Sequence, residues 1–372
     1  MKAAFMAQAF QVNGRLFSVE ALGGGNVNDS YMVILRTVFS EERFILQRIN
    51  RKVFKHPEQV MENMRIVTSH AHRKFEEEQD YADRIWQLPR VIPAKDGRDY
   101  AIDAEGEYWR AISVISSANA YMQVQSPEHA HEVGIVLGQF HRVISDLPSE
   151  QLHDTLPGFH VTPEYLKQLD AALKTDIGKE RLASSKVAQN ALKFIDERRD
   201  LCSVLEDAAA RGELKRRIIH GDPKTANVMI DDVTGKGTSI IDLDTVKPGL
   251  IQYDIGDCLR SCCNPAGEET RDFTRIVFET DLCRQLLRGY MIQGRQFLTE
   301  ADLAYFYDSV RLITFELGLR FFADYLAGDV YFKVTNEEQN LFRARVQFQL
   351  VRSIEAREAE IRSIFDSYAK KI

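Results

Sequence analysis

The chain has 372 residues, of which 44% are hydrophobic and 28% charged, and its formal net charge is −7 at pH 7. This composition is ordinary for a soluble globular protein. The acidic balance weighs against a nucleic-acid partner, whose binding surface is basic, and the 10% aromatic content excludes a largely disordered chain. No apolar run reaches the roughly 18 residues of a membrane span, and residues 1–20 hold no sustained apolar stretch, so we expect neither a membrane segment nor a secretory signal.

The length and the cysteines narrow the class further. At roughly 100–200 residues per domain, the length predicts two domains or two lobes. The number of cysteines is odd and the chain is large, which makes a disulfide framework improbable. We expect them to be small buried side chains of a cytoplasmic protein in a reducing environment. They are Cys202, Cys258, Cys262, Cys263 and Cys283.

The first third of the chain is predicted to be rich in strands. β-prone runs occur at 17–20, 31–36 and 43–47, and two more near 90–93 and 108–115. A glycine-rich turn covers 23–29, and a helix is predicted after Pro57.

The remainder is predicted to be mainly helical. Ser126-Pro127-Glu128 is a good helix start, and apolar residues at helical spacing follow from Val133 to Ile144. Further helices are expected over 162–211 and from 268 onward. Short strands interrupt them at 217–220, 227–230 and 238–242. We therefore predict an α+β fold, with a small β-rich lobe over 1–115 and a larger helical lobe over 116–372.

The segment 218–230 carries the clearest chemical pattern. An apolar run leads into His220-Gly221-Asp222, Asn227 follows five residues after the aspartate, and a second apolar run leads to Asp242. Phosphoryl transfer needs one carboxylate to orient the attacking hydroxyl, and an amide oxygen with a second carboxylate to hold magnesium on the phosphates. The spacing from Asp to Asn is that of the protein-kinase catalytic loop. Either residue alone would be an ordinary turn residue, but the agreement of these features predicts a kinase site that unites all three groups.

These residues resemble the motifs of the aminoglycoside phosphotransferase superfamily, whose kinase-like fold acts on small molecules. Residues 220–227 resemble its catalytic motif, Ile241-Asp242 its metal motif, and 253–257 its third motif. A closer resemblance, over nearly the whole chain, is to bacterial N-acetylhexosamine 1-kinases. It rests on stretches at 28–31, 44–50, 108–110, 159–163, 241–249 and 321–329. The resemblance implies a bilobal protein-kinase-like fold.

The resemblance also implies roles by position. Asp222 would be the catalytic base, Asn227 and Asp242 the ligands of Mg²⁺, and Arg320 a group that engages the substrate. Asn26 falls where the hexosamine kinases place a histidine that contacts the substrate, and Gly221 where they tend to have asparagine. The first departure leaves the identity of the sugar open.

Three features are predicted to hold ATP. Gly24 and Gly25 precede a strand and can form a plain hairpin turn or cover the phosphates with backbone N–H groups, which we favour. Gln47 stands where protein kinases carry a phosphate-binding lysine, and the hexosamine kinases share this glutamine. The resemblance implies that the backbone at Ile112 and Val114, in the stretch linking the lobes, binds adenine.

Several acidic and basic residues keep two interpretations each. Asp244 either binds substrate or caps a turn. Asp254 and Asp257 either cap a helix or brace the catalytic loop. Arg320 interrupts an apolar helix face and needs a polar or anionic partner, which is either the substrate or a carboxylate such as Asp324; the resemblance favours the substrate.

The leading hypothesis is an ATP- and magnesium-dependent kinase for the anomeric hydroxyl of an N-acetylhexosamine or a related sugar. One alternative is a kinase for another small alcohol, such as an amino alcohol, a hydroxy-amino acid or an aminoglycoside. Another is a nucleotide-binding module without turnover, a hypothesis motivated by the missing lysine. We expect no nucleic-acid, membrane or obligate protein partner.

Overall fold

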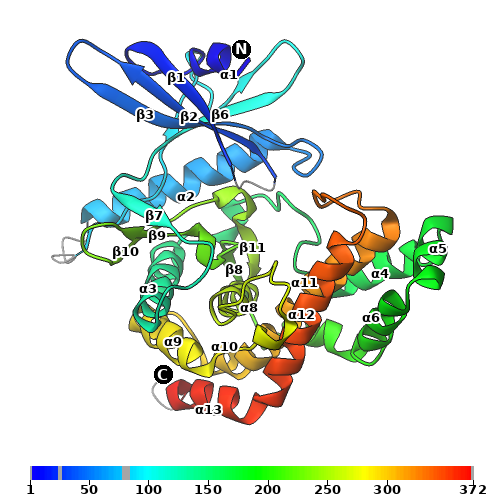
Figure 1. Cartoon of the computed structure of the whole chain (residues 1–372). Coiled ribbons are helices and arrows are strands. Elements are labelled where there is room, and N and C mark those ends of the chain that lie inside the picture. The colour runs from blue at the N-terminus through cyan, green and yellow to red at the C-terminus, as the bar shows by residue number, and fades with distance from the viewer. Residues whose placement is uncertain (1, 24–26, 78–83, 370–372) are drawn as a thin grey trace. The chain divides into compact units, whose positions relative to one another are not determined.

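The computed structural model describes residues 2–23, 27–77 and 84–369 (Figure 1). Gly24, Gly25 and Asn26 lie outside the described residues. The chain forms two compact units. The first comprises Met1–Asn119, Asp146–Pro157 and Met229–Pro248, and the second Ala120–Ser145, Gly158–Val228 and Gly249–Ile372. The predicted α+β class is confirmed, whereas the lobe boundary at residue 115 stays a prediction.

An antiparallel sheet dominates the first unit. Its order is β1-β2-β3-β6-β4, with β5 paired to β6. The three strands predicted first are confirmed, and each has 8 residues, more than the 4, 6 and 5 residues expected. The bounds are β1 (Arg15–Leu22), β2 (Asp29–Arg36), β3 (Glu41–Arg48), β4 (Val91–Ile92), β5 (Ala101–Ile102) and β6 (Tyr108–Ser113).

One face of this sheet packs into a small core. Val33 and Leu35 on β2 and Phe44 and Leu46 on β3 alternate along their strands and are buried together, as period-two patterning requires. The short helix α1 (Lys2–Ala7) contributes to this cluster. The predicted helix after His56 is α2 (Pro57–Glu77), whose buried face includes Val60, Met61, Met64 and Val67.

A second, smaller sheet has the order β10-β9-β7. Its strands are β7 (Ala118–Ala120), β9 (Val228–Asp231) and β10 (Gly237–Ile240). The prediction of a strand over 238–242 was wrong at its end. The strand stops at Ile240, and Asp242 adopts a left-handed conformation with φ 67° and ψ 56° before the 3₁₀ turn η4 (Leu243–Thr245). Asp244 therefore lies in a turn.

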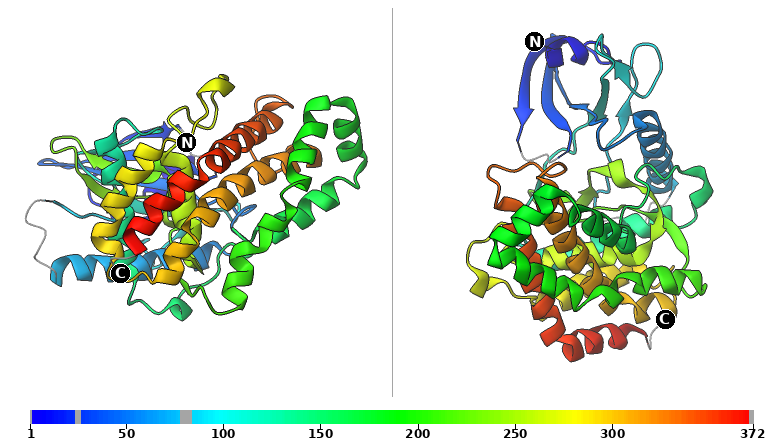
Figure 2. Two further views of the ribbon diagram at one scale, coloured as in Figure 1. Left: turned by 90° about the horizontal axis from the view of Figure 1, so that it is seen from below. Right: turned by 90° about the vertical axis from the view of Figure 1, so that its right-hand side faces the viewer.

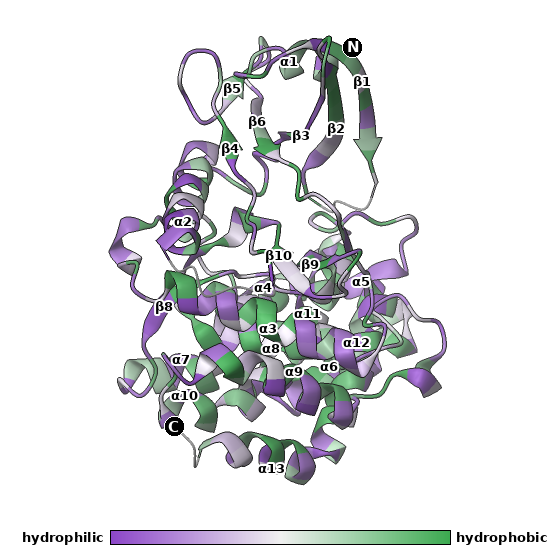
Figure 3. Cartoon of the chain, turned by 90° about the vertical axis from the view of Figure 1, so that its left-hand side faces the viewer, coloured by the Kyte–Doolittle hydropathy of each residue, from purple (hydrophilic) through white to green (hydrophobic). Residues whose placement is uncertain are grey.

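Helices dominate the second unit, as predicted. Ser126 caps α3 by accepting a hydrogen bond from the His129 N–H, with Pro127 in the first turn. Apolar residues along α3 appear green in Figure 3. The helices are α3 (Pro127–Ile144), α4 (Thr162–Ala172), α5 (Asp176–Ser184), α6 (Lys186–Asp196), α7 (Val204–Ala210), α8 (Ile251–Cys262), α9 (Thr280–Gly294), α10 (Glu300–Ala304), α11 (Phe306–Ala327), α12 (Gln339–Ala356) and α13 (Glu358–Ala369).

Two helix pairs organise this unit. Glycines let α3 and α9 approach closely, because a Cβ at Gly134 would lie 1.9 Å from the Leu286 carbonyl oxygen and one at Gly289 2.0 Å from that of His131. The second pair is α11 and α12, which lie side by side in both views of Figure 2. The aromatic rings of Phe315 and Phe348 meet between these two helices. The strand β8 (Arg216–Ile219), which leads into the predicted catalytic motif, pairs with β11 (Lys247–Leu250).

All five cysteines are buried and free, which confirms that part of the cysteine prediction. Among the helices of the described ranges, none is long and apolar enough to cross a membrane.

Candidate active site

The predicted catalytic residues Asp222 and Asn227 lie together in the second unit. The amide nitrogen of Asn227 donates to the backbone oxygen of Asp222 at 2.7 Å and to its Oδ2 at 3.2 Å. Lys224 Nζ lies 2.6 Å from the same Oδ2. The loop therefore folds around the carboxylate of Asp222 through its own residues.

The electrostatics of Asp222 suit a proton acceptor. Burial raises the pKa of this carboxyl group, but the Lys224 ammonium outweighs the burial and leaves the pKa below its ordinary value. The group is therefore an ionised carboxylate at neutral pH, able to accept a hydrogen bond from a substrate hydroxyl.

Gly221 takes the conformation that the loop requires. Its φ is +87°, in the left-handed region, where glycine is unstrained and asparagine is among the best tolerated of the other residues. Glycine at position 221 therefore lets the loop turn without backbone strain.

Asp254 braces the catalytic loop. Its carboxylate accepts hydrogen bonds from the His220 N–H at 2.6 Å and the Gly221 N–H at 2.8 Å. The oxygen that accepts from His220, Oδ2, also lies 2.8 Å from His141 Nε2. Burial raises the pKa of Asp254, but His141 outweighs it and the pKa is lowered. Of the two interpretations left open, bracing is the one that these contacts support.

Asp257 lies one turn further along α8. Its Oδ1 accepts from Arg260, at 3.0 Å from Nε and 2.8 Å from Nη2. Its Oδ2 is buried with no hydrogen-bond partner in the part of the chain that the structure describes. Burial raises the pKa of Asp257, and the negative charge of Asp222 adds to the rise although Arg260 opposes it.

A buried pair, His160 and Glu316, supports the loop from another side. His160 Nε2 lies 2.7 Å from the Gly221 carbonyl oxygen, and Nδ1 lies 2.9 Å from Glu316 Oε1. Because both ring nitrogens face acceptors, both must carry protons, so the ring is an imidazolium. Thr162 donates to the second oxygen of Glu316 at 2.7 Å.

Arg320 is surrounded by aromatic rings. Its guanidinium carbon lies 5.0 to 5.9 Å from four ring centroids, those of Phe159, Tyr165, Tyr331 and Phe332. The side chain is half-buried. Burial opposes the charge, but the surrounding tyrosines, Glu316 and Asp222 outweigh it and hold the pKa above its ordinary value.

The alternative partner for Arg320, Asp324, is engaged elsewhere. It accepts from the backbone N–H groups of Val330, Tyr331 and Phe332, and from the Asn340 amide at 2.9 Å. Among the described residues no ion pair or hydrogen bond joins Arg320 to a carboxylate. The pairing of Arg320 with Asp324 is therefore wrong, and the prediction that Arg320 meets the substrate stays a prediction.

In the first unit, Asp244 is buried and paired. Arg110 Nη1 forms an ion pair with its Oδ1, and Asn28 Nδ2 donates to its Oδ2 at 2.6 Å. Gln47, predicted at the position of the strand lysine, donates to Ser30 Oγ at 2.8 Å and accepts from Arg110 Nε at 2.8 Å. These polar groups form one connected network.

The expected adenine contacts remain predictions. Ile112 pairs with Ile45 on β3 and Val91 on β4. Val114 follows directly after the end of β6 at Ser113.

The donor set suits the magnesium ion that the motifs imply. The nitrogen of the Asn227 amide is taken by Asp222, which leaves the amide oxygen as a ligand. Asp242 would supply a carboxylate. Mg²⁺ in such sites takes one or two protein oxygens and completes its shell with water and phosphate. No cluster of three His, Cys, Asp or Glu side chains suited to a metal occurs within the described ranges.

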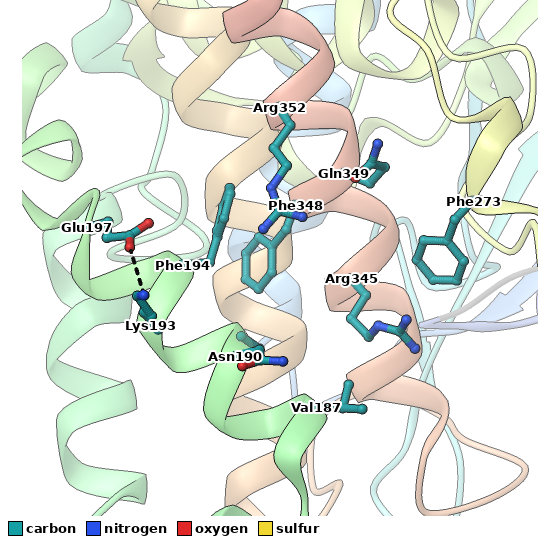
Figure 4. A pocket seen from close by; sticks show the side chains of 11 residues that line it. Val187, Asn190, Lys193, Phe194, Glu197, Phe273, Arg345, Phe348, Gln349 and Arg352 are labelled. Carbon is teal, nitrogen blue, oxygen red and sulfur yellow. Dashed lines mark ion pairs between the residues drawn. The ribbon is translucent and has the colours of Figure 1, made fainter.

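A separate cavity of about 550 Å³ lies in the second unit between α6 and α12 (Figure 4). Lys193, Arg345 and Arg352 lie around it, with Phe194 and Phe348 among its apolar walls. None of the predicted site residues lines it.

Sequence reasoning missed several supporting residues. Lys224 had a local signal, since it is the one cation between Asp222 and Asn227. His141, Glu316 and Arg110 had none, because their partners are distant in sequence.

The fold and the braced catalytic loop define a kinase-like phosphotransferase for small molecules. The chain belongs to the phosphotransferase enzyme family (APH), whose model matches residues 18–282. A likeness in fold extends over nearly the whole chain to three solved structures. One is a microcompartment-associated aminopropanol kinase, with 16% identity, coverage of 97% of this chain and 98% of that one, and a TM-score of 0.60. A choline kinase from Cryptosporidium parvum Iowa II has 14% identity, coverage of 96% and 95%, and a TM-score of 0.58. A spectinomycin phosphotransferase solved with ADP and spectinomycin has 13% identity, coverage of 96% and 97%, and a TM-score of 0.55.

Proposed function

We propose that the chain is an ATP- and magnesium-dependent kinase for a hydroxyl of an uncharged sugar. The anomeric hydroxyl of an N-acetylhexosamine is the leading candidate. The reaction class follows from the family. The sugar is our proposal, and the surroundings of Arg320 carry it.

The catalytic roles belong to the loop that begins at His220. Asp222 accepts the hydrogen bond of the acceptor hydroxyl and orients its oxygen toward the γ-phosphate of ATP. Asn227 and Asp242 hold magnesium, which neutralises negative charge as it develops on the phosphates. Asp254 and His160 keep the backbone of the loop in place.

The aromatic rings around Arg320 argue against a cationic substrate. Such rings are the groups with which proteins enclose a quaternary ammonium ion. Here they already surround a guanidinium, and a second cation beside it would be repelled. The guanidinium offers several N–H donors in a plane, which suits the hydroxyl and amide oxygens of a sugar. Arg320 lies one helical turn after Glu316 on α11, and Glu316 pairs with His160, which contacts the Gly221 carbonyl oxygen next to Asp222; this chain of contacts supports a shared substrate for Arg320 and Asp222.

The alternative acceptor is a small amino alcohol. The names of two structurally similar proteins, an aminopropanol kinase and a choline kinase, motivate it. At 14 to 16% identity these similarities support the fold and leave the acceptor open.

A substrate panel tests the proposal. ADP release with ATP and Mg²⁺ is measured across hexoses, N-acetylhexosamines, hexuronic acids, amino alcohols, choline and aminoglycosides. We expect turnover on an N-acetylhexosamine, loss of it in Asp222→Asn, and a product whose phosphate phosphorus NMR locates on the anomeric carbon. Turnover confined to cationic alcohols would refute the sugar proposal. ATP binding without turnover on any acceptor would instead support a non-catalytic module.

Two arginine variants sharpen the test. Arg320→Gln is expected to raise KM for the sugar by about tenfold or more, as the loss of a charged hydrogen bond does. Arg352→Gln is the matched control, because that guanidinium also lies over a ring, 4.8 Å from the Phe194 centroid, but lines the separate cavity of Figure 4. Equal effects of the two variants would remove Arg320 from the substrate site.

A further inference from the structure

A row of polar side chains crosses the sheet of the first unit. The strands β2, β3 and β6 belong to one sheet (Figure 1). Ser30 on β2, Gln47 on β3 and Arg110 on β6 are direct cross-strand partners in its register. Direct partners point to the same face, and hydrogen bonds of 2.8 Å link each to the next. A protein kinase would have its lysine in the middle of this row.

The row ends on Asp244. The side chains of Arg110 and Asp244 are 1% and 4% exposed, so the guanidinium is closed to solvent and out of reach of a phosphate. Asn28 completes the surroundings of Asp244, and its Oδ1 accepts from the Asn50 N–H at 3.0 Å. A buried charge pair of this kind is held firmly because each partner depends on the other.

Asp244 lies two residues beyond Asp242, whose conformation needs support. Aspartate visits the left-handed region that Asp242 adopts more readily than most residues with a Cβ, but glycine alone is unstrained there. Such a residue persists only where its surroundings determine the backbone, and functional sites are where this is common. The anchored Asp244 provides that constraint, together with Asn63, which donates to the Val246 carbonyl oxygen at 3.0 Å.

We propose that Arg110, which bonds to Gln47 at the position of the absent strand lysine, is a positioning residue. Through its ion pair with Asp244, it fixes the turn that directs the Asp242 carboxylate to the metal. The proposal rests on the proposed function only in taking Asp242 as a metal ligand. It also assigns Asp244 to positioning, in place of the substrate contact expected from its sequence position.

The test measures metal binding directly. Mn²⁺ replaces Mg²⁺, and its dissociation constant is obtained by electron paramagnetic resonance with a non-hydrolysable ATP analogue present. Arg110→Met is expected to weaken Mn²⁺ binding by about tenfold, the lower end of the effect of losing a direct partner of a metal ligand, because Arg110 acts on Asp242 through Asp244; kcat should fall as well. Binding of the analogue without metal should change less than about threefold, because Arg110 does not contact phosphate in this proposal.

Controls separate positioning from general stability. Val33→Ala removes apolar volume from the core of the first unit, to which Trp109 and Ala111 on either side of Arg110 also belong. This variant should lower the melting temperature yet leave Mn²⁺ binding unchanged. Arg110→Lys keeps the positive charge but lacks the planar fork that bonds to Gln47 and Asp244 at once. It should therefore weaken Mn²⁺ binding less than Arg110→Met does. If Arg110→Met fails to fold, Arg110→Lys takes its place in the test. Unchanged Mn²⁺ binding in both Arg110 variants would overturn the proposal.

The two proposals can fail separately. The Mn²⁺ measurement uses no acceptor, so an incorrect sugar leaves it unaffected. Asp242→Asn tests the shared premise: if this variant binds Mn²⁺ as well as the wild type, Asp242 is not a metal ligand and the positioning proposal is overturned with it.

Discussion

The His160 and Glu316 pair makes a prediction about pH. Burial lowers the pKa of His160, but Glu316 outweighs it and raises the pKa above its ordinary value of 6.5. The folded protein therefore holds this proton more tightly than the unfolded chain. The resulting stability is fully present below about pH 6.5 and is lost as the pH rises through the folded-state pKa.

The size of the effect follows from the contacts of the pair. Removing one partner of a buried ion pair costs about 3–5 kcal/mol, because the other charge stays buried. In His160→Gln, Thr162 still donates to Glu316 and the new amide can donate one hydrogen bond. We therefore expect a loss at the lower end, about 3 kcal/mol at pH 6, which becomes smaller as the pH rises above 6.5 toward the folded-state pKa of His160.

Denaturant unfolding of both proteins from pH 5.5 to 9 measures this difference. The control is His153→Gln, which breaks a His–Glu pair of similar length, 2.8 Å to Glu62, whose side chains are 39% and 49% exposed. That exposed pair should contribute less than about 1 kcal/mol. If the difference between wild type and His160→Gln is the same at pH 6 and pH 9, the imidazolium assignment is wrong.

Three further substitutions have clear expected outcomes. Gly289→Ala would place a Cβ 2.0 Å from a backbone oxygen of α3, so thermal unfolding should show a loss of about 3 kcal/mol or more; Gly294→Ala, which meets only side-chain atoms at 3.1 Å and beyond, is its control and should change stability far less. Asp254→Asn replaces an acceptor with an N–H donor opposite a backbone N–H, and steady-state assays should show a fall in kcat with KM for ATP nearly unchanged. Gln47→Lys removes the acceptor of Arg110 Nε and should destabilise the protein by about 1–3 kcal/mol in urea; a more active or more stable variant would contradict the network.

The secondary structure was predictable where its signals are local. Short β-prone runs marked the strands of the first sheet, and Ser126-Pro127 marked the start of α3 with its cap. The end of β10 was missed because Asp242 leaves the strand for a left-handed turn. The sequence 240–242 contains no glycine to signal such a turn, and contacts from distant residues impose it.

In the candidate site too, residues with local sequence signals were predicted and residues held by distant partners were missed. Asp222 and Asn227 were predicted because they lie in one loop at a spacing typical of kinase catalytic loops. The groups that hold this loop come from far along the chain: His141 precedes Asp254 by 113 residues, and Glu316 follows His160 by 156. Such pairs leave no local pattern, since either partner alone is an ordinary residue on a helix or a loop.

The absence of a lysine at position 47 is explained by contacts that only the three-dimensional structure shows. In sequence, Gln47 is a loss of charge at a position where kinases need a cation. In the structure, the charge lies on the neighbouring strand, and the glutamine bonds to it through the acceptor that a lysine would lack. Arg110 suits this place because its planar fork can donate to Gln47 and Asp244 at once, whereas an ammonium is a compact point charge. Gln47 and Arg110 therefore depend on each other, and replacing either one alone would leave the polar groups of the other without their partner.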